Sequence, residues 1–212
     1  MDNPVNNDSK LRIAVRYRLL GAANANNEFK VALAAFEFAE QRTTGFRKNG
    51  TTPNFMHPVE VGAYLMTLQS SLRHPGEALA ASFLHDVMED YGVTFDELRE
   101  RFGHMVAHAT MRLSKVVGGV KLSSMDEYFE NMLDCPIAPC VKGSDRINNQ
   151  GTMVGAFSPL KQMEYVEESE KYILPMLKKA RRLYSDQEAV FENIKLMLKN
   201  QVLLVRAIHQ TI

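Results

Sequence analysis

One histidine and three carboxylic acids lie within six residues, in the segment HDVMED that begins at His85. On a helix, His85 and Glu89 share one face, as do Asp86 and Asp90. Adjacent His and Asp side chains can both reach one cation, because successive helical side chains lie about 100° apart and a helix end splays them further. Carboxylates this close raise one another's pKa unless a cation compensates them. The segment therefore indicates a cation site, and a solvated acidic helix face is the alternative.

Two other segments add residues of the same chemical types. The first has an Arg47-Lys48 pair in a loop and His57 at the start of an expected helix. In the second, Asp145 and Asn149 are spaced i,i+4 and share a helix face. A mixed imidazole and carboxylate shell would come from His57, His85, Asp86 and Asp145. Such a ligand set suits a borderline-to-hard divalent ion such as Mn²⁺ or Fe²⁺, and it leaves positions open for water and a phosphate oxygen.

The order of these residues, H…HD…D, resembles that of the HD-domain metal-dependent phosphohydrolases. Four segments resemble the RelA/SpoT-type members in the same order: FAEQRTTGFRKNG–PNFMHPVEV, FLHDVMEDYGVTFDELRERFG, RLSKV and VKGSDRINNQGT. They run from about residue 35 to about residue 153, which is more than half of the chain. The resemblance implies a small alarmone hydrolase that removes the 3′-pyrophosphate of (p)ppGpp and leaves GDP or GTP. It also implies a chain too short for the synthetase domain of the long family members.

The resemblance further implies a role for each matched residue. It assigns Mn²⁺ to His57, His85, Asp86 and Asp145, and it assigns the orientation and deprotonation of the attacking water to Glu89 and Asp90. It also implies that Arg47 stacks on guanine and that Lys48 meets phosphate. Asn149 would contact the ribose or hold the reacting phosphate, and Thr152 would contact the nucleoside. These roles are chemically reasonable, because a planar guanidinium covers an aromatic base well and a metal lowers the pKa of water.

A substrate with several phosphates needs cations beyond the metal. Lys115, Lys142 and Arg146 are candidates for this contact, and pairing with the acidic cluster is the alternative for each. The chain also departs from the family pattern at two points. The loop 49–55 is one residue longer than usual, and a glycine-serine pair replaces the usual leucine-alanine before Asp145. Both departures bear on substrate preference rather than on the metal site.

Helical periodicity predicts an all-α fold, and the resemblance implies the helical bundle of the HD-domain phosphohydrolases. Pro58 and Pro75 can open helices, and Thr94 with Glu97 forms a capping box. Helices are expected over 27–42, 58–68, 75–89, 94–101, 103–115, 124–133, 138–150, 160–182 and 186–209. Strand signals are nearly absent, because no alternating β-branched run occurs. We expect a single domain over residues 1–212, with an arm or a short helix at 1–25 and no synthetase domain.

The composition narrows the class of protein. The chain has 25 basic and 25 acidic side chains and no net charge. This balance argues against a dedicated binder of nucleic acid or of an anionic membrane, which is normally basic. A polar start and the lack of a long apolar run argue against a signal peptide and a membrane span. Cys135 and Cys140 have no zinc-knuckle spacing and are expected to be free, partly buried thiols. We expect a cytoplasmic protein whose partner is a guanine nucleotide. The sequence leaves open whether the protein forms a homo-oligomer.

Two other functions stay open. One is an HD-domain hydrolase of another nucleotide: the 2′-phosphate of NADPH, a dNTP or an adenosine alarmone. The other is an antitoxin-type protein that neutralises an alarmone-synthesising toxin.

His104 and His108 are spaced as a metal pair but lack the Glu of a metalloprotease motif. The basic stretch 178–182 is expected to form a solvated helix face. Tyr184 is a candidate substrate contact, because the family has a tyrosine on a late helix.

Overall fold

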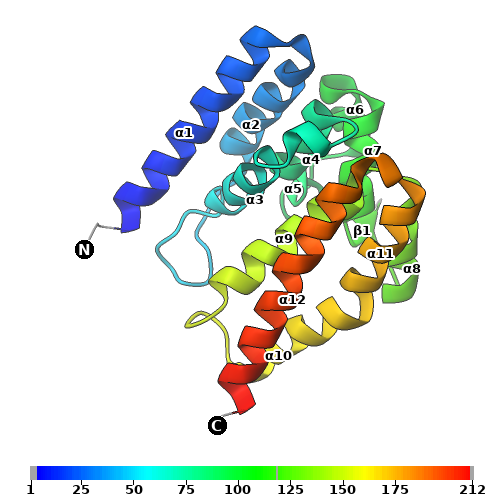
Figure 1. The fold of residues 1–212 in the computed structure, drawn as a ribbon. Helices are drawn as coiled ribbons and strands as arrows, with labels where there is room; N and C mark the ends of the chain where they lie inside the picture. Colours follow the sequence, from blue (N-terminus) through cyan, green and yellow to red (C-terminus); the bar gives the residue numbers. More distant parts are fainter. Residues whose placement is uncertain (1–3, 118, 211–212) are drawn as a thin grey trace.

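The computed structural model describes residues 4–117 and 119–210, and most of them are helical (Figure 1). The α-helices are α1 (Pro4–Ala25), α2 (Lys30–Arg42), α3 (Met56–Met66), α4 (Pro75–Leu84), α5 (Val87–Tyr91), α6 (Phe95–Phe102), α7 (His104–Leu113), α8 (Met125–Asn131), α9 (Ala138–Thr152), α10 (Pro159–Glu168), α11 (Leu174–Leu183) and α12 (Glu188–Gln210). The shorter elements are the 3-10 helices Asn27–Phe29, Gln69–Ser71, Met132–Asp134 and Ser185–Gln187, the π-helical turn Ser169–Ile173, and strands β1 (Val116–Val117) and β2 (Val120–Lys121). Within the described ranges, no helix is both long and apolar enough to cross a bilayer.

The all-α fold predicted from the sequence is confirmed, with one small addition. Strands β1 and β2 pair antiparallel, with Val116 opposite Lys121. Gly119 in the connecting turn has a φ of +78°, a left-handed conformation that glycine adopts without strain. A hairpin with two residues in each strand is too short to leave an alternating pattern in the sequence.

The prediction of one helix over residues 75–89 is wrong. Helix α4 ends at Leu84, and α5 begins at Val87 after a turn formed by His85 and Asp86. The Nδ1 atom of His85 lies 2.8 Å from the carbonyl oxygen of Ser82. The imidazole thus satisfies a carbonyl that the end of the helix leaves without a backbone partner. The break brings His85 Nε2 and Asp86 Oδ2 to within 3.1 Å of each other.

The segment expected as an arm or a short helix is the 22-residue helix α1. Val15 and Leu19, one turn apart, are almost fully buried and dock this helix on the rest of the chain. Exposed ion pairs, among them Arg16 with Glu37, link it to α2. Exposed pairs contribute little to stability, so the apolar contacts hold α1 in place.

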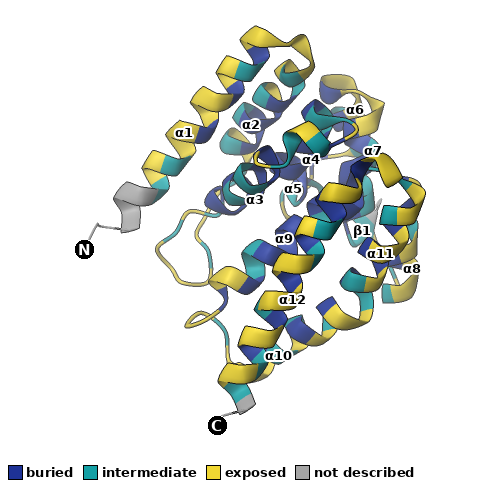
Figure 2. Cartoon of the chain, viewed as in Figure 1, coloured by how far each residue is buried: buried dark blue, intermediate teal, exposed yellow. Residues whose placement is uncertain are grey.

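Helix α4 lies at the centre of the bundle, and most of its residues are buried (Figure 2). Phe83 on α4 meets Phe36 of α2 edge to face, with ring centroids 5.3 Å apart. Phe36 also meets Phe55, the residue before α3, at a centroid distance of 5.1 Å. Aromatic rings prefer such edge-to-face contacts. This cluster fixes the start of α3, where His57 lies.

The C-terminal part contributes a second, small apolar cluster beside the main core. It consists of Met153, Val166, Val202 and Val205, from the end of α9 and from α10 and α12. The helix expected over 160–182 is interrupted by the π-helical turn Ser169–Ile173. Pro175 follows directly in α11, and because its nitrogen carries no hydrogen it cannot donate to a carbonyl of the preceding turn.

Gly76 is expected to be sensitive to any side chain. A Cβ atom there would collide with the backbone carbonyl of Glu28, which has little room to move. Gly76→Ala should therefore destabilise the protein by about 1–3 kcal/mol, as overpacking does. Gly21→Ala on α1 is the matched control, because nothing lies within 4 Å of the added atom. Thermal unfolding should give a lowered midpoint for the first variant only, and equal midpoints would contradict the packing described.

Candidate metal centre

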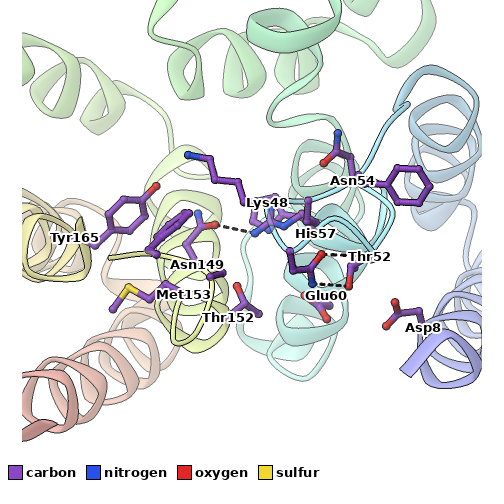
Figure 3. A pocket seen from close by; sticks show the side chains of 15 residues that line it. Asp8, Lys48, Thr52, Asn54, His57, Glu60, Asn149, Thr152, Met153 and Tyr165 are labelled. Carbon is purple, nitrogen blue, oxygen red and sulfur yellow. Dashed lines mark hydrogen bonds between the residues drawn. The ribbon is translucent and has the colours of Figure 1, made fainter. Parts of the chain in front are cut away.

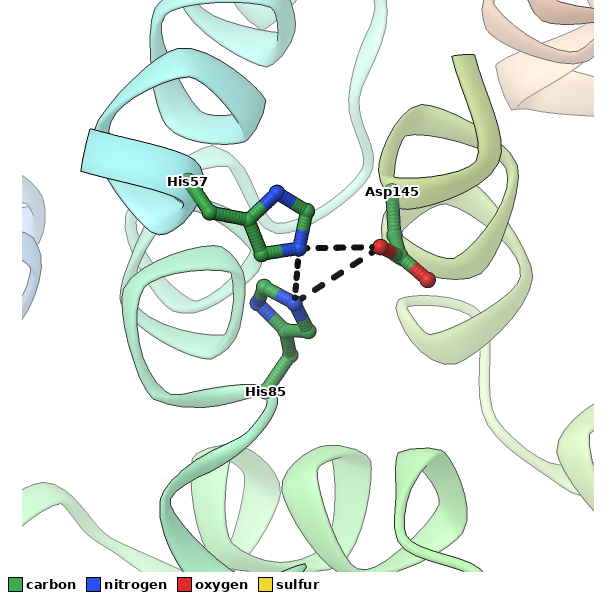
Figure 4. A group of neighbouring side chains, drawn as sticks. All are labelled: His57, His85 and Asp145. Carbon is green, nitrogen blue, oxygen red and sulfur yellow. Dashed lines mark hydrogen bonds and ion pairs between the residues drawn. The ribbon is translucent and has the colours of Figure 1, made fainter. Parts of the chain in front are cut away.

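Three separate segments bring the predicted metal ligands together (Figure 4). His57 is in the first turn of α3, His85 and Asp86 form the turn between α4 and α5, and Asp145 lies within α9. His57, His85 and Asp145 are buried, whereas the side chain of Asp86 is 47% exposed. The centre is therefore closed on the side of the core and open at Asp86.

One ligand atom of each residue points toward a common centre. His57 Nε2 lies 3.0 Å from Asp145 Oδ1 and 3.1 Å from His85 Nε2. Asp86 Oδ2 lies 3.1 Å from His85 Nε2 and 3.7 Å from His57 Nε2. Ligand atoms about 2.1 Å from one ion are themselves about 3–3.5 Å apart. The ligand atoms of His57, His85 and Asp145 are therefore close enough to hold one ion, and Asp86 borders them at His85.

The second ring nitrogen of each histidine has its own acceptor. His57 Nδ1 lies 2.6 Å from Asn148 Oδ1, and His85 Nδ1 lies 2.8 Å from the Ser82 carbonyl. These partners accept a hydrogen from Nδ1 of each ring, so both Nε2 atoms can turn a lone pair toward an ion once the proton on His85 Nε2 is displaced. Asn148 donates in turn to Glu60 Oε2 at 2.6 Å, which fixes its orientation. Such lone pairs beside two carboxylates fit a bound divalent cation.

The surrounding charges prepare these residues for a cation. Burial would raise the pKa of Asp145, but Lys142, 2.9 Å from Oδ2, and the two histidines hold it well below its usual range. Burial also opposes a charge on His85, yet Asp86, Asp145 and the Ser82 carbonyl together raise the pKa of His85 to about 9. A proton therefore competes with a metal ion for His85 Nε2 at neutral pH.

Glu89 and Asp90 lie on α5, directly after the turn that carries His85 and Asp86, and both are exposed. Glu89 Oε2 accepts a hydrogen bond from the backbone N–H of Lys115 at 2.8 Å. Partial burial and the charges of Asp86 and Glu89 raise the pKa of Asp90. A small pocket of about 80 Å³ is lined by Asp86 and Asp90 and reaches the metal centre. Polar walls of this kind suit ordered water.

A larger pocket of about 420 Å³ shares His57 with the small one (Figure 3). Small-molecule sites typically have volumes of about 300–1,000 Å³. Four of the predicted substrate residues line it: Arg47, Lys48, Asn149 and Thr152. Arg47 Nη2 donates to Asn149 Oδ1 at 3.2 Å, and Asn149 Nδ2 donates to Asp145 Oδ1 at 2.5 Å. Asn149 therefore connects the pocket to the metal ligands.

Lys142 and Arg146, the other predicted substrate contacts, do not line either pocket. Lys142 is largely buried and forms an ion pair with Asp145. Arg146 is buried, pairs with Glu168 at 2.5 Å and lies over the ring of Tyr165 at 4.3 Å. Both cations thus pair with acids, but with Asp145 and Glu168 rather than with the acidic cluster at 85–90 that the sequence offered as the alternative.

Some residues of the site were not identified from the sequence: Asn148, Glu60, Phe157 and Tyr165. Their position in the sequence could have indicated two of them. Asn148 directly precedes Asn149, and Glu60 follows His57 by about one helical turn. Phe157 and Tyr165 line the large pocket, and only the fold places them there.

Tyr184 has a different place from the one expected. Its hydroxyl donates to the Leu133 carbonyl at 2.7 Å, and it does not line the large pocket. The prediction of a substrate contact for Tyr184 is therefore wrong, and the tyrosine of a late helix that lines the pocket is Tyr165. Cys135 and Cys140 are free and buried, as predicted.

The arrangement matches a known domain. Residues 35–132 match the family model of the HD domain, and the predicted all-α fold class is confirmed. A solved structure described as a metazoan ortholog of SpoT that hydrolyzes ppGpp and plays a role in starvation responses has a similar fold. The TM-score is 0.59 at 16% identity, over 81% of this chain and 93% of that one.

Curated relatives support the resemblance to RelA/SpoT-type proteins, which is thereby confirmed. The guanosine-3′,5′-bis(diphosphate) 3′-pyrophosphohydrolase of Aquifex aeolicus (strain VF5) is 29% identical over 147 residues, 67% of this chain and 20% of the relative. The bifunctional (p)ppGpp synthase/hydrolase SpoT of Escherichia coli (strain K12) is 26% identical over 157 residues, 71% of this chain and 22% of the relative. The chain thus spans about a fifth of the length of these relatives.

Metal binding should displace a proton from His85. The pKa of His85, about 9 in the folded protein, keeps a proton on the imidazole at neutral pH, and the ion must remove it. The apparent affinity for Mn²⁺ should therefore rise from pH 6.5 to pH 9. Titration calorimetry in two buffers of different ionisation enthalpy measures the protons released. An affinity that is constant over this range would contradict the assignment.

Asn148→Ala should weaken Mn²⁺ binding by about 10–100-fold, because the partner that fixes His57 is lost. Asn200→Ala is the matched control, since Asn200 is exposed on α12. Calorimetry on both variants measures the effect. Equal affinities would show that Asn148 does not position His57.

Proposed function

We propose that residues 1–212 act as one metal-dependent hydrolase that removes the 3′-pyrophosphate of ppGpp and pppGpp. The observation that carries this proposal is a pocket of nucleotide size, lined by Arg47 and Lys48, that shares His57 with the metal centre. The relatives from Aquifex aeolicus and Escherichia coli are named for the same activity, and the metazoan SpoT ortholog with the similar fold is described as hydrolyzing ppGpp.

The metal in this proposal is Mn²⁺. Its ligands are His57, His85, Asp86 and Asp145, a mixed set of imidazoles and carboxylates that suits this ion. When bound, such an ion lowers the pKa of water and polarises a phosphoryl oxygen. Lys142 keeps Asp145 ionised, and Asn148 keeps the lone pair of His57 Nε2 directed at the centre.

Glu89 and Asp90 orient the attacking water, and Asp90 accepts its proton. A carboxylate with a raised pKa is a better general base near neutral pH. The water oxygen forms a bond to the 3′-linked phosphorus, and the bond between this phosphorus and the ribose 3′-oxygen breaks. The 3′-oxygen takes up a proton, and the products are pyrophosphate and GDP or GTP.

The substrate is held by residues of the large pocket. The planar guanidinium of Arg47 covers guanine, and Lys48 contacts a phosphate. Asn149 contacts the ribose or the reacting phosphate beside Asp145, and Thr152 contacts the nucleoside. In this proposal Lys142 and Arg146 act from inside the bundle, where they are paired with acids.

The partner in this proposal is a small guanine nucleotide, hydrolysed in the cytoplasm, where such nucleotides are used. Competing functions give different experimental results. Another HD-domain hydrolase would act on NADPH, a dNTP or an adenosine alarmone in place of ppGpp. A protein that neutralises an alarmone-synthesising toxin by binding alone would keep its effect without turnover.

Purified protein with Mn²⁺ should convert ppGpp to GDP and pyrophosphate, and pppGpp to GTP and pyrophosphate. Chelation of the metal should abolish turnover, and added Mn²⁺ should restore it, because the ion supplies the activated water. The same chromatographic assay with ppApp, NADPH and dNTPs measures the competing substrates. An absence of pyrophosphate from ppGpp, while calorimetry shows bound metal, would refute the proposal.

The double variant Glu89→Gln with Asp90→Asn should lower kcat by about 10²–10⁴-fold, the usual contribution of a general base. Its affinity for Mn²⁺ should change little, since neither residue is a proposed ligand. Asp96→Asn with Glu100→Gln, at two exposed acids of α6, is the matched control for the change in charge. A double variant that turns over like the control would show that neither acid acts on the water.

A further inference from the structure

The large pocket has two chemically different sides (Figure 3). On one side Lys48 Nζ lies 4.9 Å from the ring centroid of Phe157, near Tyr165. On the other side the pocket is lined by two carboxylates, Asp8 from α1 and Glu60 from α3. His57 of the metal centre lines the pocket between the two sides.

This division of charge orients a nucleotide. The reacting 3′-phosphate has to meet the metal ligands at His57, and the 5′-phosphates carry further negative charge. Like charges repel strongly in a partly closed cavity, so the 5′-phosphates favour the side of Lys48 over that of Asp8. The neutral base then occupies the side of Asp8.

We propose that Asp8 is a base-specificity residue that accepts hydrogen bonds from the Watson–Crick edge of guanine, an inference that rests on the proposed function. Guanine presents N1–H and a 2-amino group side by side, and the two oxygens of a carboxylate can accept from both. Adenine presents an unprotonated N1 at the same place, which would face the carboxylate with a lone pair. Asp8 therefore favours a guanine nucleotide over an adenine nucleotide.

Asp8 suits this role better than Glu60 does. Glu60 Oε2 already accepts from Asn148, as part of the chain that orients His57. Among residues 8–116 and 119–209, whose side chains the structure describes, Asp8 by contrast has no hydrogen bond or ion pair with another side chain. The backbone N–H of Arg47 donates to the Thr52 carbonyl at 2.7 Å, and Thr52 lies on the Asp8 side of the pocket. The loop that carries Arg47 is thus hydrogen-bonded to a residue on the Asp8 side, and Arg47 and Asp8 line the same pocket.

Helix α1 lies outside residues 35–132, which match the HD domain. Base selection by Asp8 would come from α1, whereas the metal ligands lie on α3, on α9 and in the turn between α4 and α5. This separation allows the base preference to be changed without changing the hydrolytic residues.

Equilibrium binding of GDP, IDP and ADP tests the inference independently of hydrolysis. The proteins are the full chain, Asp8→Asn, Asp8→Ala and the control Glu100→Gln, each checked by thermal unfolding. The unchanged chain and the control should bind GDP about tenfold or more tightly than ADP, with IDP between them because inosine lacks the 2-amino group. Asp8→Ala should remove the preference. Asp8→Asn should shift it toward ADP, because an amide can donate to adenine N1 and accept from its 6-amino group.

The inference is overturned if both Asp8 variants keep the ratio of GDP to ADP affinity of the unchanged chain, or if that chain has no preference. Turnover of ppGpp, measured in parallel, separates the two claims. Turnover without an effect of Asp8 on the ratio refutes only the role of Asp8. An effect of Asp8 on the ratio without turnover supports guanine recognition and refutes the proposed hydrolysis.

Discussion

His57, His85 and Asp145 meet at one centre with Asp86 beside it, and carboxylates this close require compensating positive charge, from a proton on His85 or from a cation. The rest of the structure provides for that requirement. Helix α4 ends at Leu84, and the turn of His85 and Asp86 brings His85 Nε2 and Asp86 Oδ2 to within 3.1 Å of each other. The aromatic contacts around Phe36 fix the start of α3 and so hold His57 within 3.1 Å of His85.

The same centre determines how the pocket is connected to the chemistry. Asn149 donates to Asp145 and accepts from Arg47, so one side chain contacts both a metal ligand and a wall of the pocket. The far wall, near Tyr165, packs on the small apolar cluster at the ends of α9 and α12 rather than on the main core. The metal centre thus belongs to the main bundle, whereas part of the large pocket depends on the C-terminal helices and on α1.

The sequence predicted the metal centre better than the pocket, for a physical reason. Ligands such as His57 and Asp145 are rare residue types in a fixed order, so motif spacing identifies them without knowledge of the fold. Phe157 and Tyr165 are ordinary apolar and aromatic residues, and only tertiary packing gives them a function. The break at His85 was missed because helix formers flank it and neither proline nor glycine marks it. The helix start at Thr94 was predicted correctly, since the cap depends on local chemistry, although the Glu97 carboxylate pairs with Arg42 and not with the Thr94 N–H.

The central claim is that water attacks the 3′-linked phosphorus at this centre. Hydrolysis of ppGpp by the Mn²⁺-loaded protein in water enriched in ¹⁸O, with mass analysis of the products, tests it most directly. The account predicts one ¹⁸O atom in pyrophosphate and none in GDP, because the bond between phosphorus and the ribose 3′-oxygen breaks. Label in GDP, or orthophosphate as the labelled product, would contradict it.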